Sequence, residues 1–128
     1  MSVYPALFSP LRIGQRQVRN RVAVPATLTN FGRNNQITEP WGNYLIERAK
    51  GGAGLIVSEI IAVDPEAIAH DAVVTGFDDR NDKGFVTVAG AVHEAGALLV
   101  GQLWHPGRQQ LWHPTKSPMG VSQQPDAL

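Results

Sequence analysis

Three short apolar runs alternate with two amphipathic segments over most of this chain. The runs cover residues 22–25, 53–58 and 98–103, and the middle one is apolar almost throughout. A strand that is covered on both faces has such a continuous apolar run, whereas a strand with one wet face alternates. Strands that alternate with helices along a chain pair in parallel, because each helix returns the chain to the end of the sheet at which the previous strand began. We therefore predict an α/β fold with these three strands adjacent and parallel.

The two amphipathic segments predict helices over residues 39–50 and 82–95, both on one side of the sheet. Thr38 is a favourable N-cap for the first helix, and Pro40 suits its first turn. Asp82 is the expected cap of the second helix. The apolar stripe of the second helix consists of Phe85, Val88, Ala89, Val92 and Ala95.

The two ends of the chain have a different character. Residues 7–14 and 17–22 flank a glycine-containing turn and predict a short hairpin ahead of the first parallel strand. The segment 112–128 holds Pro114, Pro118 and Pro125, which predicts loop throughout.

Two architectures fit a parallel α/β chain, and the glycine pattern separates them. A dinucleotide-binding Rossmann domain needs a glycine fingerprint just after its first strand, where this chain has Pro25, Ala26 and Thr27. The glycine cluster at 51–54 precedes a strand and so cannot cradle a pyrophosphate. A (β/α)₈ barrel remains, but a whole barrel takes about 250 residues. We expect the 128 residues to be one partial barrel domain, with the rest of the barrel absent from this chain.

The composition argues against several classes of partner. Eleven basic and eleven acidic residues cancel, although residues 1–38 hold five arginines and no acid, while residues 59–82 hold seven acids and one arginine. The two stretches either pair in the fold or form a polyanion site; the arginines lack interleaved aromatic residues, which disfavours nucleic acid. The chain has no cysteine, so it forms no disulfide or thiolate metal site. It opens without a leader-like segment and has no apolar run long enough for a membrane span, so we expect a cytoplasmic location.

Gln102 ends the third apolar run, just before a loop that breaks at Pro106 and Gly107. Ligands of parallel α/β proteins lie at the carboxyl ends of the strands, so Gln102 is the first candidate site residue. His105 more simply shapes this loop than acts as an acid or base, and no third ligand accompanies it and His113. We therefore predict neither a metal site nor a catalytic residue within the chain.

An ordered series of motifs resembles the old yellow enzyme family of FMN-dependent oxidoreductases, in its branch of 2,4-dienoyl-CoA reductase and trimethylamine dehydrogenase. The matching residues are Leu7–Pro10 with Ile13-Gly14, Asn20–Ala26, Glu47–Ala49, Gly54–Val57, Gly76-Phe77, Val92–Ala97 and Gln102–Arg108. The resemblance implies an eight-stranded barrel whose entry is plugged by the N-terminal hairpin, with FMN across its C-terminal mouth.

Carried over by position, the resemblance places five residues against the flavin. Pro25, Ala26 and Thr27 would pack beside the ring, Ile60 would flank it, and the Gln102 carboxamide would bond its pyrimidine edge. An amide both donates and accepts, which suits the alternating donors and acceptors of that edge. The family's substrate-binding pair, its tyrosine and its phosphate site would all lie beyond residue 128.

The implied activity is hydride transfer from NAD(P)H through FMN to an activated C=C bond of a small enone or enoyl-type molecule. Two alternatives stay open: an FMN-dependent amine dehydrogenase or demethylase of the same family, and a non-catalytic partial barrel that assembles with another chain. The expected partners are the small-molecule substrate, the rest of the barrel in the same or another polypeptide, and a second copy of the chain. The chain alone should be inactive.

Overall fold

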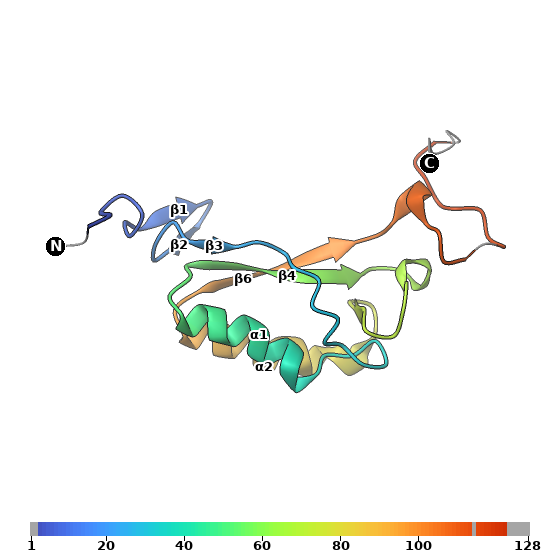
Figure 1. Cartoon of the computed structure of the whole chain (residues 1–128), viewed down its shortest axis with the longest axis horizontal. Coiled ribbons are helices and arrows are strands. Elements are labelled where there is room, and N and C mark those ends of the chain that lie inside the picture. The colour runs from blue at the N-terminus through green and yellow to red at the C-terminus, as the bar shows by residue number, and fades with distance from the viewer. Residues whose placement is uncertain (1–2, 114, 123–128) are drawn as a thin grey trace.

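A layer of parallel strands lies over two helices, with the N-terminal hairpin at one end and the C-terminal loops at the other (Figure 1). The computed structural model describes residues 3–113 and 115–122. Among these residues, no helix combines the length and apolar character that crossing a membrane requires. The predicted cytoplasmic location stays a prediction. Of the C-terminal segment predicted to be loop, Pro114 and residues 123–128, including Pro125, lie outside the described residues.

The three predicted strands are adjacent and parallel. Strand β4 (Leu55–Ala62) is central, with β3 (Ala23–Val24) on one side and β6 (Leu98–Trp104) along the other. This confirms the predicted strand order, although β4 runs beyond the predicted 53–58. A further short strand, β5 (Val74–Thr75), pairs with the end of β4 on the side of β3 and was not predicted.

The two predicted helices are also present, as α1 (Glu39–Lys50) and α2 (Asp82–Glu94). The Thr38 side chain caps α1 by accepting a hydrogen bond from the Trp41 amide, as expected. The prediction that Asp82 caps α2 was wrong. The short 3₁₀ turn η2 (Asp79–Asn81) runs directly into α2, so the chain is already helical at Asp82 and the N-cap is Asn81.

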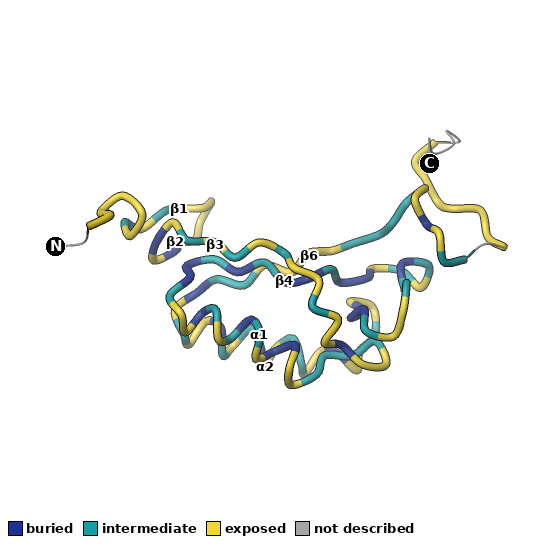
Figure 2. Tube along the Cα trace, viewed as in Figure 1, coloured by how far each residue is buried: buried dark blue, intermediate teal, exposed yellow. Residues whose placement is uncertain are grey.

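The main core lies between the sheet and the two helices. It contains Ile56 of β4, Trp41 and Leu45 of α1, and Val88 and Val92 of α2, all buried. The helices approach closely at Gly42, where an added methyl group would lie 2.8 Å from a Val88 methyl carbon. Figure 2 shows exposed positions along the side of the helix layer that is away from the sheet.

The hairpin of β1 (Leu11–Ile13) and β2 (Arg16–Val18) confirms the predicted N-terminal element. Arg19, which follows β2, donates hydrogen bonds to the carbonyl oxygens of Ala49, Ala53 and Ala95. Ala49 and Ala95 lie at the C-terminal ends of α1 and α2, where helix carbonyls lack intrahelical partners and the helix dipole favours a cation. One of the N-terminal arginines therefore binds helix ends rather than the acidic stretch.

Replacing Arg19 should loosen the hairpin from both helices. We expect Arg19→Met to lower the free energy of unfolding by about 1–2 kcal/mol, since charge-assisted bonds to the carbonyls are lost while the apolar stem is kept. Urea unfolding measures the change. Arg12→Met is the matched control, because the Arg12 guanidinium contacts only the nearby Gly14 carbonyl among the bonds described and is exposed; equal losses in both variants would contradict the role of Arg19.

Candidate functional site

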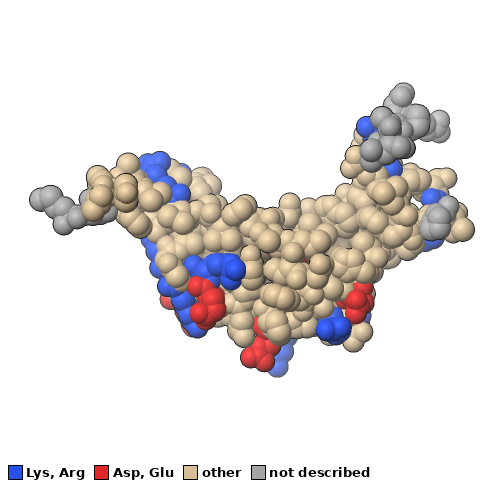
Figure 3. Space-filling model, viewed as in Figure 1, with Lys and Arg blue, Asp and Glu red and all other residues tan. Residues whose placement is uncertain are grey.

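The sheet has one face on the helices and one that the described residues leave open. Val24, Ile56 and Leu99 pack in the helix-side core, so their neighbours along each strand face the other way. Val100 and Gln102 of β6 lie on this second face and are exposed. In Figure 3 the charged side chains gather on the helix side and toward the two ends, whereas the sheet side between the ends is uncharged in this view. We call this second surface the open face.

A β-bulge in β4 decides which residues reach the open face. Val57 pairs with Val100 and Ile60 pairs with Gln102, so β4 has one more residue than β6 between these two pairs. Ser58 and Glu59, the two residues of the bulge, are both buried. The Ser58 hydroxyl accepts a hydrogen bond from the backbone N–H of Gln102 at 3.2 Å and donates one to the backbone carbonyl of Glu59 at 2.7 Å. Bulges re-aim side chains in this way beside functional sites.

The bulge places Ile60 on the open face, directly beside Gln102. The two are register partners in β4 and β6, so two of the five predicted flavin-contact residues are neighbours. Ile60 is half-buried against a small apolar cluster that includes Ala62, Ala67 and Val73. The Gln102 residue is exposed, so its carboxamide is accessible from the open face.

The other three predicted residues begin the loop that follows β3. Pro25 and Thr27 are exposed and Ala26 is half-buried. The Thr27 hydroxyl makes a long bond of 3.4 Å to the Pro25 carbonyl. Since Val24 pairs with Ile56, this loop leaves the sheet toward the carboxyl end of β4, the end at which Ile60 lies.

Glu59 is a buried acid beside the candidate site that the sequence reasoning missed. Its side chain is 3% exposed, and one carboxylate oxygen accepts hydrogen bonds from the amide and the hydroxyl of Thr29. The other oxygen accepts from the Trp41 indole N–H at 2.8 Å. The carboxylate thus joins the loop after β3 to helix α1. An acid inside an apolar strand was the available signal, because a charge is buried only when it is paired or hydrogen-bonded.

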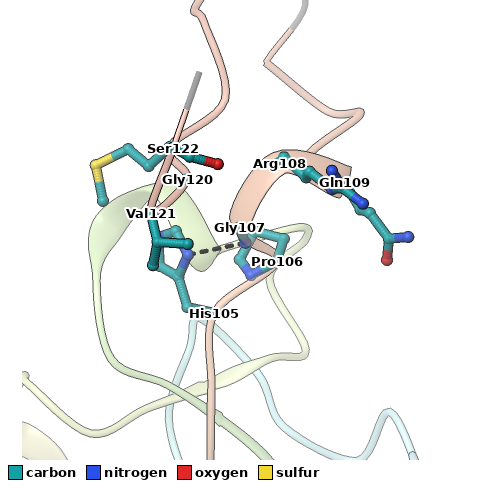
Figure 4. Close-up of a pocket in the computed structure, with 9 residues that line it drawn as sticks. His105, Pro106, Gly107, Arg108, Gln109, Gly120, Val121 and Ser122 are labelled. Atoms are coloured by element: carbon teal, nitrogen blue, oxygen red, sulfur yellow. Dashed lines mark hydrogen bonds between the residues drawn. The ribbon is translucent and has the colours of Figure 1, made fainter. Parts of the chain in front are cut away.

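A separate pocket of about 610 Å³ lies among the loops after β6 (Figure 4). His105 to Gln109 and Met119 to Ser122 line it, and none of the five predicted flavin-contact residues does. His105 Nδ1 accepts a hydrogen bond from the Gly107 amide at 2.9 Å, which agrees with the predicted loop-shaping role. The 3₁₀ turn η3 (Gly107–Gln109) begins two residues after His105.

Comparison with known proteins identifies the family. The sequence model of the NADH:flavin oxidoreductase / NADH oxidase family matches residues 6–127. The chain belongs to the old yellow enzyme family. Its parallel strands and helices are accordingly the opening part of that family's (β/α)₈ barrel, as predicted. An old yellow enzyme homologue from Zymomonas mobilis superposes with a TM-score of 0.72 at 35% identity, over 81% of this chain and 29% of that one.

Two curated relatives show the range of names within the family. NADH oxidase of Thermoanaerobacter brockii is 35% identical over 98% of this chain and 20% of its own length. N,N-dimethylglycine/sarcosine dehydrogenase of Chromohalobacter salexigens is 33% identical over 83% of this chain and 16% of its own length. The chain therefore spans about a fifth of the length of these relatives.

Proposed function

We propose that this chain supplies the first flavin-contacting strands of an FMN-dependent oxidoreductase, which passes hydride from NAD(P)H through FMN to an activated C=C bond. The observation that carries the proposal is the Ile60–Gln102 pair, which lies on the open face toward the carboxyl ends of parallel strands, with Ile60 half-buried and Gln102 exposed. Ligands of parallel α/β proteins lie at the carboxyl ends of the strands. Family membership supports a flavin and a nicotinamide reductant in general.

The residues present fit an isoalloxazine ring. Gln102 offers a donor and an acceptor in one plane, as the pyrimidine edge requires. Ile60 and Pro25 offer apolar surface for the ring itself, while Thr27 offers a weakly engaged hydroxyl. The Thr29 hydroxyl already donates to Glu59, so Thr27 is the better placed of the two to donate to a ligand. The flavin, when bound, supplies the hydride chemistry.

Within this proposal the chain binds and orients the cofactor and supplies no acid or base. Gln102 would hold one edge of the ring, and the loop beginning at Pro25 would limit the position of the ring on the open face. The groups that bind the substrate and the cofactor phosphate would come from the rest of the barrel. We propose a cytoplasmic location for the assembled enzyme.

An amine dehydrogenase is the second candidate, favoured by the similarity to the N,N-dimethylglycine/sarcosine dehydrogenase. Both reactions would use the same cofactor, so the residues described here do not separate them. The complete protein, reconstituted with FMN, distinguishes the two directly. Reoxidation of its reduced flavin by cyclohexenone supports the proposed reductase, whereas anaerobic reduction of its oxidised flavin by sarcosine supports the alternative. Absence of a bound flavin would contradict both.

Exposed apolar side chains on the two faces of β6 predict how the 128-residue chain behaves alone. Val100 and Leu103 of β6 are 46% and 72% exposed, so apolar surface lies next to a strand edge. We expect the isolated chain to self-associate at micromolar concentration, because such edges and patches pair with other chains. Sedimentation velocity measures this. Val100→Lys with Leu103→Lys should yield a smaller species, and a wild-type chain that sediments as a compact monomer would contradict the expectation.

A further inference from the structure

Glu59 lies where the two halves of the candidate flavin site meet. It is the residue before Ile60 in β4, and its carboxylate is bonded to Thr29 in the loop that begins at Pro25. Ile60 is in turn the register partner of Gln102. One buried side chain therefore connects the backbone on both sides of the predicted ring position.

The hydrogen-bond partners of Glu59 need an acceptor at each oxygen. Its three partners are the Thr29 amide, the Thr29 hydroxyl and the Trp41 indole, which all donate. A carboxylate accepts at both oxygens, whereas a carboxamide accepts at only one. A glutamine at position 59 would direct its amino group at either Thr29 or Trp41, so that its N–H would face the Thr29 amide N–H or the indole N–H. The cost is high because the site is buried.

The Trp41 side of the Glu59 hydrogen-bond connection is rigid. Trp41 is 2% exposed and packs edge-to-face on Phe85, with ring centroids 6.3 Å apart. The loop end is different, since Pro25 and Thr27 are exposed and the Thr27 hydroxyl makes only a long bond. A fault in this connection would therefore displace the loop more readily than the core.

We infer that Glu59 is a positioning residue for the flavin: it fixes the position of the loop of residues 25–29 relative to Ile60 and Gln102. The inference rests on the proposed function, because it assigns the loop to the ring. Glu59 itself is buried and does not touch the open face. Its effect passes through Thr29 to the loop and through the β4 backbone to Ile60.

Four variants of the complete protein test this. Glu59→Gln removes one acceptor, and we expect FMN to bind about tenfold more weakly, with a shifted reduction potential. Glu59→Asp keeps both oxygens and should restore part of the affinity. Thr29→Val removes one donor and should weaken FMN binding about threefold. Thr75→Val is its matched control, because it also removes a hydrogen-bonded hydroxyl, but one that faces Asn35 and Asn81; its FMN affinity should stay within about twofold.

A readout without flavin completes the test. In the apo protein, Glu59→Gln should move the Trp41 indole N–H proton resonance, assigned with Trp41→Phe, while Thr75→Val should not. Changed FMN affinity and potential in Glu59→Gln and Thr29→Val, but not in Thr75→Val, support the inference. If Glu59→Gln leaves affinity and potential at wild-type values, or if the losses in all variants follow only their lost stability, the inference is overturned. If the wild-type protein binds no FMN, the proposed function itself fails.

Discussion

Gln102→Leu should weaken FMN binding by up to roughly a hundredfold while the protein stays folded. The Gln102 carboxamide is accessible on the open face, and its register partner is Ile60. A buried polar group on the flavin edge that loses its partner costs about 1–3 kcal/mol, and 1.4 kcal/mol is tenfold in affinity. Leucine keeps most of the volume of glutamine, so the packing beside Ile60 survives. Titration of FMN into the apo form of the complete protein measures the loss.

The same substitution should make the bound flavin harder to reduce. Reduction places negative charge on the pyrimidine side of the ring, and a positioned N–H donor there stabilises that charge. A leucine offers no donor, so the reduction potential should become more negative. Spectroscopic titration against a reference dye gives this value separately from affinity.

Gln17→Leu is the matched control for both measurements. Gln17 is an exposed residue of β2, in the hairpin at the opposite end of the sheet from the loops that follow β6 (Figure 1). It should leave FMN affinity and potential unchanged. If Gln102→Leu behaves like Gln17→Leu, then Gln102 is an ordinary strand-end residue and the main site assignment is lost.

Local sequence patterns predicted the regular part of the fold because each was strong by itself. The apolar run around Ile56 could only be a covered strand, and Thr38 with Pro40 marked the start of α1. The short strand β5 was missed because two residues have no periodicity, and its pairing with Ile61 and Ala62 is entirely tertiary. The cap of α2 was misplaced because a 3₁₀ turn flows into the helix, and nothing local distinguishes Asn81 from Asp82 as the boundary.

The candidate site shows the same division. Gln102 could be singled out from its place at the end of an apolar strand, and the other four predicted contact residues came from family resemblance. The bulge at Ser58 and Glu59 could not be predicted, because it is defined by the pairing of β4 with β6 rather than by either strand. That bulge turns Ile60 toward Gln102 and buries Glu59, so the geometry of the site depends on a long-range contact.

Asn81→Ala should lower the free energy of unfolding by about 3 kcal/mol. Asn81 is 1% exposed. Its amide nitrogen donates to the Asn35 carbonyl at 2.9 Å, the Thr75 carbonyl at 2.9 Å and the Thr75 hydroxyl at 3.1 Å. Its oxygen accepts from the Ile37 amide at 2.9 Å. Alanine would leave the Ile37 N–H and the Thr75 carbonyl without this partner in a place that water reaches poorly.

Two further variants separate the hydrogen bonds from the volume of the side chain. Asn81→Asp keeps an acceptor for the Ile37 amide but cannot donate when ionised, and it buries a charge, so it should lose at least as much stability as Asn81→Ala. Asn43→Ala is the control, since Asn43 is exposed on α1 and makes a 3.4 Å bond to Glu39; it should change stability by less than about 0.5 kcal/mol. Urea unfolding of the three variants gives the comparison. Because Asn81 joins the segment after β3, the strand β5 and the start of α2, equal losses in Asn81→Ala and Asn43→Ala would mean that these segments are held by apolar packing alone.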